Sequence, residues 1–297
     1  MKGLRLRDAR AGDREPVFEF CKKTWPEYGD YIPRVWSRWL RDPKGRLIVA
    51  EFEGAPVALG KVTDFGRGEI WLEGLRVDPG FRRAGIADAM HEEVMRTVKK
   101  FKPRFMRFCT GADNRASRRI GKKYGFEAIA CFRYYWRKSR KGTPRGDLAA
   151  RRDADRVYDF IMQSRFLRLS SGQIAEGWIF REMSRDLLAG YIRQRRVMVM
   201  RRSGRLSGVA VYPYEENEES TTLGFVDGDP GAIKVLARNC IYLAKEHGGK
   251  FCSAAVPARG FAGLIDQAGF LRKDSVGQVV LEHRRGRRDT GRLGKHR

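Results

Sequence analysis

Glu69–Val77 is predicted to form a β-strand, because apolar and polar residues alternate in its second half. Successive side chains of a strand point to opposite faces, so Trp71, Glu73, Leu75 and Val77 are predicted to share one face. The stretch Asp78-Pro79-Gly80 is predicted to end the strand, because proline has no ladder donor and glycine permits a turn.

After this turn the apolar residues recur with the period of a helix. We expect the helix to open with Arg82–Ala87 and to run to about Lys100, and its apolar stripe is Ile86, Met90, Val94 and Val98. A basic turn between a strand and a helix is suited to an anion, because the first N–H groups of a helix lack partners and its dipole favours negative charge. Gly85 lets a phosphate approach the backbone.

Similar patterns divide the rest of the first half into short elements. The predicted strands are Leu4–Asp8, Arg46–Phe52, Pro56–Asp64, Arg104–Thr110 and two last strands within Phe126–Lys138. The predicted helices are Asp13–Lys23, Pro33–Leu40 and Arg115–Tyr124. This mixture predicts an α/β fold with a mixed sheet.

The second half repeats this order of elements. The hairpin around Gly204 mirrors the one around Glu53-Gly54, Leu223–Pro230 mirrors Leu72–Pro79, and Ala232–Glu246 mirrors the phosphate-side helix. We therefore expect two tandem domains of one fold, at residues 1–140 and 151–283. Between and after them we expect a linker at 141–150 and a basic, disordered tail at 284–297.

The composition limits the setting of the protein. No apolar run reaches membrane-spanning length, the first residues lack a secretory pattern, and the five cysteines are scattered, so we expect a cytoplasmic protein without a membrane partner or a metal site. The formal charge of +25 allows a nucleic-acid partner, although its spread along the chain fits a generally arginine-rich protein as well. Monomer and homodimer both stay open.

The turn Arg82-Arg83-Ala84-Gly85-Ile86-Ala87 resembles the acetyl-CoA signature of the GCN5-related N-acetyltransferases (GNAT), Arg/Gln-x-x-Gly-x-Gly/Ala. The preceding Leu75–Pro79 resembles that family's fourth strand, and Asn114-x-Ala116 with Tyr124-Gly125-Phe126 resembles its next conserved element. The resemblance implies the acyl-CoA N-acyltransferase fold and acetyl-CoA as co-substrate for an amine acceptor.

The resemblance also implies roles for single residues. The residues expected to bind acetyl-CoA are Leu75, Arg76 and Val77 along the pantetheine, Arg82, Arg83, Ala84, Gly85, Ile86 and Ala87 at the pyrophosphate, and Asn114. Glu73 is our candidate for the general base, with Glu69 as second choice; a salt bridge to arginine is the alternative reading of Glu73.

The general acid is open, because many relatives place a tyrosine where this chain has Gly121. Tyr124 is three residues further on and could compensate partly, although packing, or protonation of the thiolate by solvent, also explains the sequence. An acyl-cysteine route through Cys109 or Cys131 competes with buried structural thiols, and the family normally uses direct attack.

The acceptor pocket is expected in the helix–loop–helix segment before the first hairpin. Its aromatic residues Trp25, Tyr28, Tyr31 and Trp36 are candidates to line the pocket, with core packing as the alternative for each. The segment from Gly29–Pro33 through Trp36 and Trp39-Leu40 to Asp42-Pro43, combined with Glu73–Val77, also resembles the histidine N-acetyltransferase-like branch. This resemblance would imply the α-amine of a free amino acid; peptide N-termini, lysines, polyamines and aminoglycosides stay open.

The second copy differs where the coenzyme would bind. It has Asp227 and Asp229 and no arginine at the positions that mirror Arg82 and Arg83, and carboxylates repel a pyrophosphate. We expect this domain to be degenerate. Two competing functions stay open: a nucleic-acid-associated protein on a transferase scaffold, and a CoA-binding regulatory module without turnover.

Overall fold

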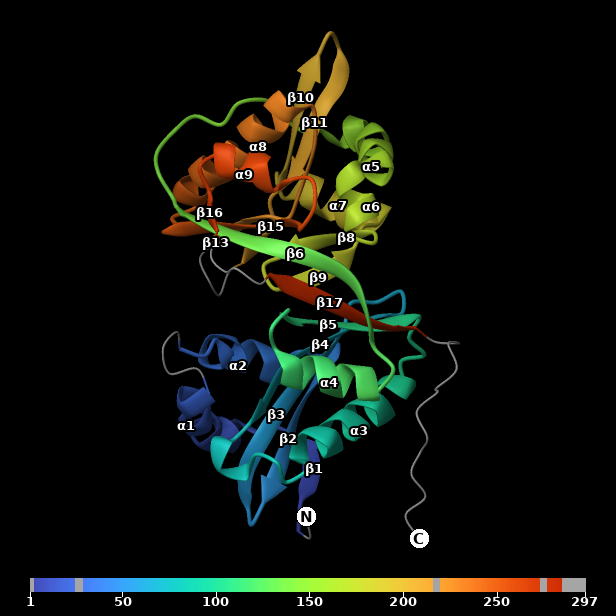
Figure 1. Cartoon of the computed structure of the whole chain (residues 1–297), viewed down its shortest axis with the longest axis vertical. Helices are drawn as coiled ribbons and strands as arrows, with labels where there is room; N and C mark the ends of the chain where they lie inside the picture. Colours follow the sequence, from blue (N-terminus) through green and yellow to red (C-terminus); the bar gives the residue numbers. More distant parts are fainter. Residues whose placement is uncertain (1–2, 25–28, 216–219, 273–276, 285–297) are drawn as a thin grey trace. The chain divides into compact units, whose positions relative to one another are not determined.

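The computed structural model describes residues 3–24, 29–215, 220–272 and 277–284. The chain forms two compact units that are not contiguous in sequence (Figure 1). The first unit contains residues 1–108, 116–127 and 282–297, and the second contains residues 109–115 and 128–281. The expected tail lies almost wholly outside the described residues.

The first unit is built on strands β1 to β5, in that order across the sheet. Its elements are β1 (Arg5–Asp8), α1 (Arg14–Thr24), α2 (Ile32–Leu40), β2 (Gly45–Phe52), β3 (Ala55–Asp64), β4 (Glu69–Val77), α3 (Ile86–Lys99), β5 (Phe105–Gly111) and α4 (Arg115–Lys123). Neighbouring strands are antiparallel except β4 and β5, which are parallel. The predicted strand Glu69–Val77 is confirmed.

Two layers of helices cover the sheet of the first unit (Figure 1). The α1/α2 side is an apolar cluster of Val17, Phe20, Cys21, Ile32, Val35, Trp36, Trp39, Leu47, Val49 and Leu59. The opposite side packs against α3, where a side chain on Gly60 would lie 3.2 Å from the methyl of Met90. Because both faces are covered, a polar side chain on β3 or β4 is held among packed atoms rather than in water.

Helix α3 begins later than the sequence predicts. It starts at Ile86 rather than Arg82, because Arg83 (φ +65°) and Gly85 (φ +78°) have left-handed backbones that cannot continue a helix. Arg82–Gly85 is therefore a loop that leads into the helix.

The alternation predicted for β4 is interrupted by a β-bulge at Gly74. Leu59 pairs with Arg76 and Lys61 pairs with Glu73, so two residues of β4 oppose the single residue Gly60. Leu59 and Lys61 lie on one face, and their partners Glu73 and Arg76 therefore share that face, on the α1/α2 side. The prediction that Glu73 and Leu75 share a face is wrong, because the bulge adds a residue between them.

Gly74 makes the bulge possible. Its φ is +71°, and a Cβ atom at this position would lie 2.6 Å from the Trp39 ring. Glycine alone combines this backbone with so close an approach of an indole ring.

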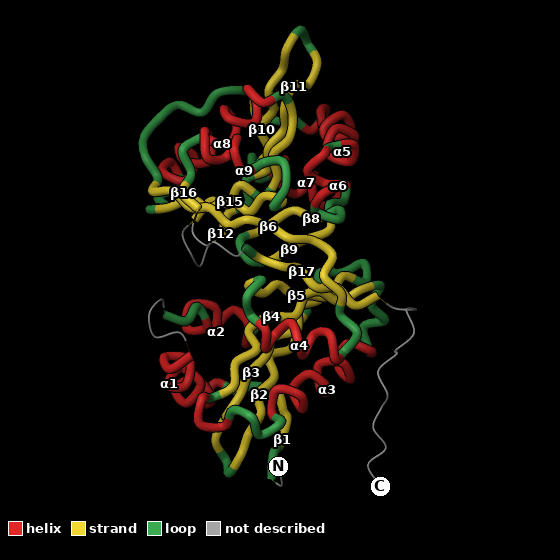
Figure 2. The backbone as a smooth tube through the Cα atoms, viewed as in Figure 1, coloured by secondary structure: helices red, strands yellow, loops and turns green. Residues whose placement is uncertain are grey.

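The second unit contains the same kinds of elements (Figure 2). Its helices are α5 (Ala154–Gln163), α6 (Arg165–Leu169), α7 (Arg185–Arg193), α8 (Pro230–Glu246) and α9 (Ala262–Gln267). Its strands include β6 (Glu127–Lys138), β7 (Asp147–Leu148), β8 (Gln173–Glu176), β9 (Ile179–Glu182), β10 (Val197–Arg202), β11 (Arg205–Val211) and β12 (Tyr214–Glu215). The remaining strands are β13 (Ser220–Leu223), β14 (Phe225–Gly228), β15 (Phe251–Pro257), β16 (Leu271–Arg272) and β17 (Gln278–Arg284), of which the last residues, from Glu282, belong to the first unit.

Two predictions about this region need correction. Phe126–Lys138 contains one long strand rather than two, because β6 pairs without interruption with β15 from Phe132 to Lys138. The expected linker at 141–150 contains β7, which pairs with β10 of the second unit, so its end is part of a sheet.

Candidate active site

The loop before α3 presents unpaired backbone amides. The N–H groups of Arg83, Ala84 and Gly85 have no acceptor within the described part of the chain, and helix geometry leaves the first N–H groups of α3 without partners as well. Arg82, Arg83 and Gly85 are exposed, and a Cβ atom on Gly85 would meet nothing within 4 Å. The loop therefore offers donors, open space and two guanidinium groups to a phosphate.

The strand β4 leaves part of one edge free. It pairs with β5 only at Glu69, Ile70 and Trp71, so within the described residues its second half has no ladder partner on β5. Leu75, Arg76 and Val77 lie in this second half, directly before the loop. An extended ligand arm can add to such an edge through backbone hydrogen bonds.

Glu73 lies on the same strand, just before the bulge. Its side chain is half-buried, and burial raises the pKa of Glu73 to about 7, opposed by the cations Lys61, Arg38 and Arg76 and reinforced by Asp42. A carboxylate whose pKa is near neutrality is suited to accept a proton in a reaction at physiological pH.

A buried lysine lies beside Glu73 on the neighbouring strand. Lys61 is its partner across β3 and β4, and the Lys61 ammonium is fully buried, 2.5 Å from a carboxylate oxygen of Asp42. The Lys61 ammonium also donates to the backbone carbonyl of Val62 over 2.8 Å. Burial lowers the pKa of Lys61, and the Asp42 carboxylate opposes that effect.

A second ion pair borders the site on β4. The Arg76 guanidinium donates to the Asp30 carboxylate over 2.7 Å, and the same carboxylate accepts the N–H of Ile32 in the first turn of α2. Arg76 also lies 5.3 Å from the centre of the Tyr31 ring. The side chain of Arg76, predicted to lie along the coenzyme, is thus bound to the segment before α2.

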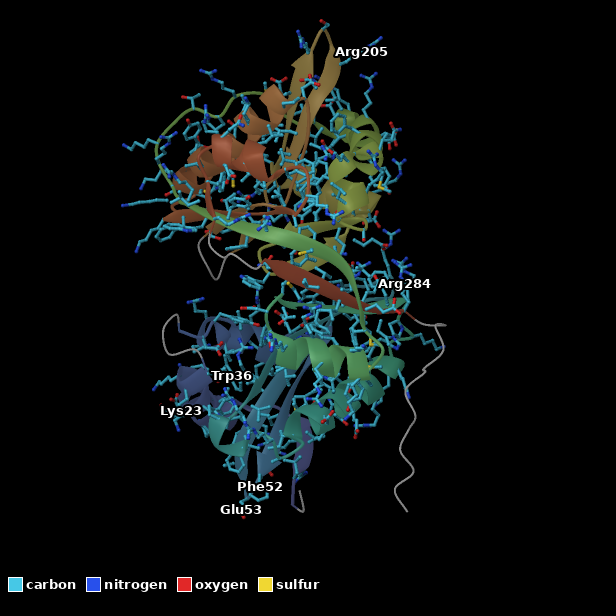
Figure 3. All side chains as sticks on the ribbon, in the orientation of Figure 1. Lys23, Trp36, Phe52, Glu53, Arg205 and Arg284 are labelled. Atoms are coloured by element: carbon cyan, nitrogen blue, oxygen red, sulfur yellow. The ribbon has the colours of Figure 1, made fainter. Side chains whose placement is uncertain are left out.

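The four predicted pocket aromatics have different positions. Trp25 and Tyr28 lie outside the described residues. Tyr31 packs edge-to-face on Trp39 with ring centres 5.8 Å apart, and the pKa of Tyr31 is raised by its burial and by the Glu73 charge. Trp36, labelled in Figure 3, is only 2% exposed and packs on Phe18, as the core-packing alternative expects.

Glu69, the second candidate base, belongs to a buried cluster of charges. Its carboxylate lies 3.7 Å from the Arg107 guanidinium, which in turn is 2.6 Å from the Glu282 carboxylate. All three residues are buried. This arrangement favours a structural ion pair for Glu69 over a role as base.

Tyr124 is held by helix α3. Its hydroxyl lies 3.1 Å from the backbone oxygen of Asp88 and 3.3 Å from the Asp88 carboxylate, and its ring stacks on His91. Burial and the carboxylates of Asp88 and Glu92 raise the pKa of Tyr124. A phenol bound in this way is occupied as a donor, which favours packing over the role of general acid.

The remaining candidates lie in the segments of the second unit. Asn114 belongs to residues 109–115, where its N–H donates to the oxygen of Gly111. Burial raises the pKa of the Cys109 thiol, which makes it a weak nucleophile and disfavours an acyl-cysteine route.

In the second unit, the region that mirrors β4 is interrupted. It is divided at Gly224 into β13, which pairs with β15, and β14, which pairs with β11. At the division the N–H of Ala175 on β8 donates to the Gly224 carbonyl over 3.1 Å. The buried Asp227 carboxylate accepts the N–H of Phe166 over 2.8 Å. The second unit thus lacks a continuous strand like β4 of the first unit.

Residues 13–126 match the model of the acetyltransferase (GNAT) family. This domain belongs to the GNAT family. Across the whole chain, the fold is similar to that of a tandem GNAT protein from the clavulanic acid biosynthesis pathway, with a TM-score of 0.60 and 14% identity over 96% of this chain and 100% of that one. The chain thus has the tandem GNAT fold predicted from its internal repeat.

Two curated relatives match a shorter stretch of this chain. Probable N-acetyltransferase 16 from Homo sapiens and histidine N-acetyltransferase from Oreochromis niloticus are each 36% identical to it over 75 residues, or 25% of this chain. The matched stretch spans only 20% and 22% of the length of these relatives.

In the described residues no helix is both long and apolar enough to cross a membrane. No three acidic, histidine or cysteine side chains of the same residues are grouped as metal ligands.

The sequence made Glu73 a candidate base and Arg82–Ala87 a candidate phosphate loop. It did not point to Lys61, Asp42 or Asp30 as site residues. A lysine within the apolar strand Val57–Val62 was the available signal, because lysines are rarely buried without a partner.

Proposed function

We propose that the GNAT domain of the first unit is an acetyl-CoA-dependent N-acetyltransferase in which Glu73 is the general base. The observation that carries this proposal is the order of parts along one continuous segment. A carboxylate with a pKa of about 7, a strand edge open to a ligand and a loop of unpaired amides follow one another within Glu73–Gly85. Thioester substrate and base would thereby be held by one rigid unit.

The residues divide the chemical work as follows. The amides and guanidinium groups of Arg82–Ala87 bind the pyrophosphate, and a backbone N–H of Leu75–Val77 donates to the thioester carbonyl, where negative charge develops. Glu73 removes a proton from the acceptor amine, directly or through one water, as the amine nitrogen bonds to the carbonyl carbon. The carbon–sulfur bond then breaks, and the CoA thiolate takes a proton from solvent.

For the acceptor we propose the primary amine of a small molecule such as a free amino acid. Similarity to a histidine N-acetyltransferase supports this class, since that relative is named for an amino acid. The charges around Glu73 support it as well, because Arg38 is exposed on α2 and faces the base. A carboxylate on the acceptor would lie favourably near this cation.

Binding of acetyl-CoA is the first test. A ligand that binds only the folded protein raises its melting temperature, so acetyl-CoA is expected to stabilise the wild-type protein. Gly85→Glu places a carboxylate at the pyrophosphate position and is expected to abolish the shift. Gly54→Glu is the matched control, because Gly54 has a similar left-handed backbone (φ +82°) and open space around it. No shift of the wild type at millimolar acetyl-CoA would contradict the proposal.

Turnover is the second test. Release of CoA thiol is measured with a panel of amino acids, polyamines and peptide amines. Glu73→Gln is expected to reduce turnover by about 10²-fold to 10⁴-fold, the usual effect of removing a general base. Its affinity for acetyl-CoA should stay close to that of the wild type. Equal turnover of Glu73→Gln and wild type would refute the assignment of the base.

The charge of +25 favours a second candidate, a nucleic-acid-associated protein on the GNAT scaffold. That function predicts RNA or DNA binding that weakens steeply with salt and is indifferent to Gly85→Glu. Absence of binding at low salt would eliminate it. A third outcome, acetyl-CoA binding without thiol release for any amine, would instead indicate a CoA-binding regulatory module.

A further inference from the structure

The Lys61–Asp42 pair occupies a space that the chain keeps open for it. A Cβ atom on Gly45 would overlap the Lys61 ammonium, the Asp42 carboxylate and the backbone oxygen of Val62. Gly45 has no left-handed backbone that would itself require glycine. The absence of a side chain at this position therefore leaves room for the ion pair as well as for the close approach of strand β3.

The pair is also costly for a purely structural contact. A fully buried lysine loses its hydration, and an apolar residue of similar volume commonly stabilises a protein as well or better. Asp42 is 21% exposed on its side chain, whereas the Lys61 ammonium has no exposure at all. Lys61 is thus buried next to Glu73, its cross-strand partner on the same face of the sheet.

We propose that the Lys61–Asp42 pair is a positioning device for Glu73: it fixes a buried cation opposite the catalytic carboxylate and so keeps that carboxylate ionised in a half-buried site. The proposal rests on the proposed function for its catalytic meaning. Lys61 itself does not touch the reacting atoms, and it acts only through Glu73.

Among the described residues, four charged groups act on Glu73 and bear on this inference. They are Lys61 on β3, Arg38 on α2, Asp42 after α2 and Arg76 on β4. Tyr31 also faces Glu73, and burial keeps it neutral by raising its pKa. Arg76 is 2.7 Å from Asp30, whereas Arg38 is exposed to solvent. Lys61 is therefore the cation whose charge acts on Glu73 with the least screening by water.

The test compares the full-length wild type with Lys61→Met, which removes the charge and keeps the length of the side chain. The ¹³C signals of labelled glutamate carboxyl groups are followed against pH, and Glu73→Gln identifies the Glu73 signal. Loss of a facing cation is expected to move the Glu73 titration upward by about one pH unit, a tenfold change in its ionisation constant. The kcat/KM should fall about tenfold below pH 7 and recover at higher pH, with unchanged affinity for acetyl-CoA.

A second variant keeps the test decisive if Lys61→Met does not fold. Gly45→Ala pushes a methyl group into the ammonium site and is expected to move the Glu73 titration in the same direction. Gly12→Ala, a glycine with open space around it, is the matched control and should leave the titration unchanged.

The outcomes separate the two proposals. An unchanged Glu73 titration in folded Lys61→Met or Gly45→Ala, or an equal loss of kcat/KM at every pH, would overturn the positioning role. If the wild type transfers no acetyl group, the proposed function fails, yet the carboxyl titration still decides whether Lys61 controls the charge of Glu73.

Discussion

Glu73 is subject to two opposing effects. Burial disfavours its charged form, and the cations on β3, β4 and α2 favour it, so that its pKa settles at about 7. A carboxylate with its ordinary pKa would be a weaker base, and one with a much higher pKa would be protonated in use. The surroundings of this one residue therefore decide at which pH the site can work.

The pH dependence of turnover follows from this pKa. Because the proposed mechanism uses the ionised carboxylate as the base, kcat/KM is expected to fall as the pH drops below about 7. The measurement uses two acceptor amines of different basicity. The acidic limb that stays near the same pH with both amines belongs to the enzyme, and it should be absent in Glu73→Gln. A limb that moves with the amine alone would contradict the assignment.

The same residue affects stability in a predictable direction. Folding raises the Glu73 pKa from 4.5 to about 7, so between these values the folded protein holds a proton that the unfolded chain releases. The free energy of unfolding is therefore expected to decrease as the pH rises through this window. Urea unfolding at several pH values measures it, and Glu73→Gln should show a smaller decrease than the wild type.

At this scale the sequence makes Glu73 a candidate base but does not point to its neighbours as site residues. Glu73 is a candidate because the resemblance places a base near this position of the fourth strand. Lys61 and Asp42 are not, since their contact joins a strand interior to a turn and depends on the space at Gly45. No local pattern in the sequence encodes such a contact.

Among the elements, the bulged strand β4 determines the geometry of the site. The bulge at Gly74 turns Glu73 and Arg76 to the α1/α2 side and leaves Leu75 between them on the strand. Without the bulge, regular alternation would place Arg76 on the opposite face from Glu73. The bulge therefore gathers the charged groups of the site on one face.

Substitution of Gly74 tests the role of the bulge. Gly74→Ala is expected to destabilise the protein by about 1–3 kcal/mol, because the new methyl group meets the Trp39 ring and the backbone is left-handed. Gly263→Ala, a helical glycine with open space, is the control and should be neutral or stabilising. Chemical denaturation measures both, and equal effects would show that the bulge tolerates a side chain.

The elements themselves were largely predictable, and their irregularities were not. The strand Glu69–Val77 matched its predicted bounds because its alternation and its turn are both local signals. The bulge depends on the pairing of Leu59 and Lys61 with β4, which is a property of two strands together. The single long strand β6 is likewise decided by its partner β15.

At the scale of the whole molecule, each of the two units is assembled from segments that are separated in the sequence. The first unit ends with residues from Glu282 onward, after the entire second unit. Arg107 is 1% exposed. The Nε and Nη2 atoms of Arg107 lie 2.7 and 2.6 Å from a carboxylate oxygen of Glu282. This buried ion pair joins positions 175 residues apart in the sequence.

Breaking this pair is expected to be costly. Glu282→Gln leaves the Arg107 charge buried with a weaker partner and should reduce the free energy of unfolding by about 3–5 kcal/mol. Asp155→Asn breaks the exposed pair with Arg185 and is the control, with an expected effect below about 1 kcal/mol. A loss of similar size in both variants would mean that the buried pair contributes no more than an exposed one.

The predicted boundary after residue 140 has a testable consequence. A fragment of residues 1–140 contains Arg107 and Glu69 but lacks Glu282. We expect this fragment to melt at a lower temperature than the first unit of the full chain, or to fail to fold, and to bind acetyl-CoA weakly. Calorimetry of fragment and full chain measures the difference. A fragment as stable as the full chain would show that Glu282 is dispensable.

The tandem repeat was visible in the sequence, because the two halves share the order of their elements. The exchange of segments was not visible, since no local feature assigns residues 109–115 to one unit and Glu282 to the other. Such assignments follow from packing between distant parts of the chain.

The late position of Glu282 has a consequence for biosynthesis. A ribosome makes the chain from its N-terminus, so the segment with Glu73 and the phosphate loop is exposed long before the partner of Arg107 is synthesised. The first unit is thus completed only after Glu282 has been translated. Products that terminate before Glu282 would carry the loop Arg82–Ala87 and Glu69 and yet lack the carboxylate that accepts hydrogen bonds from Arg107.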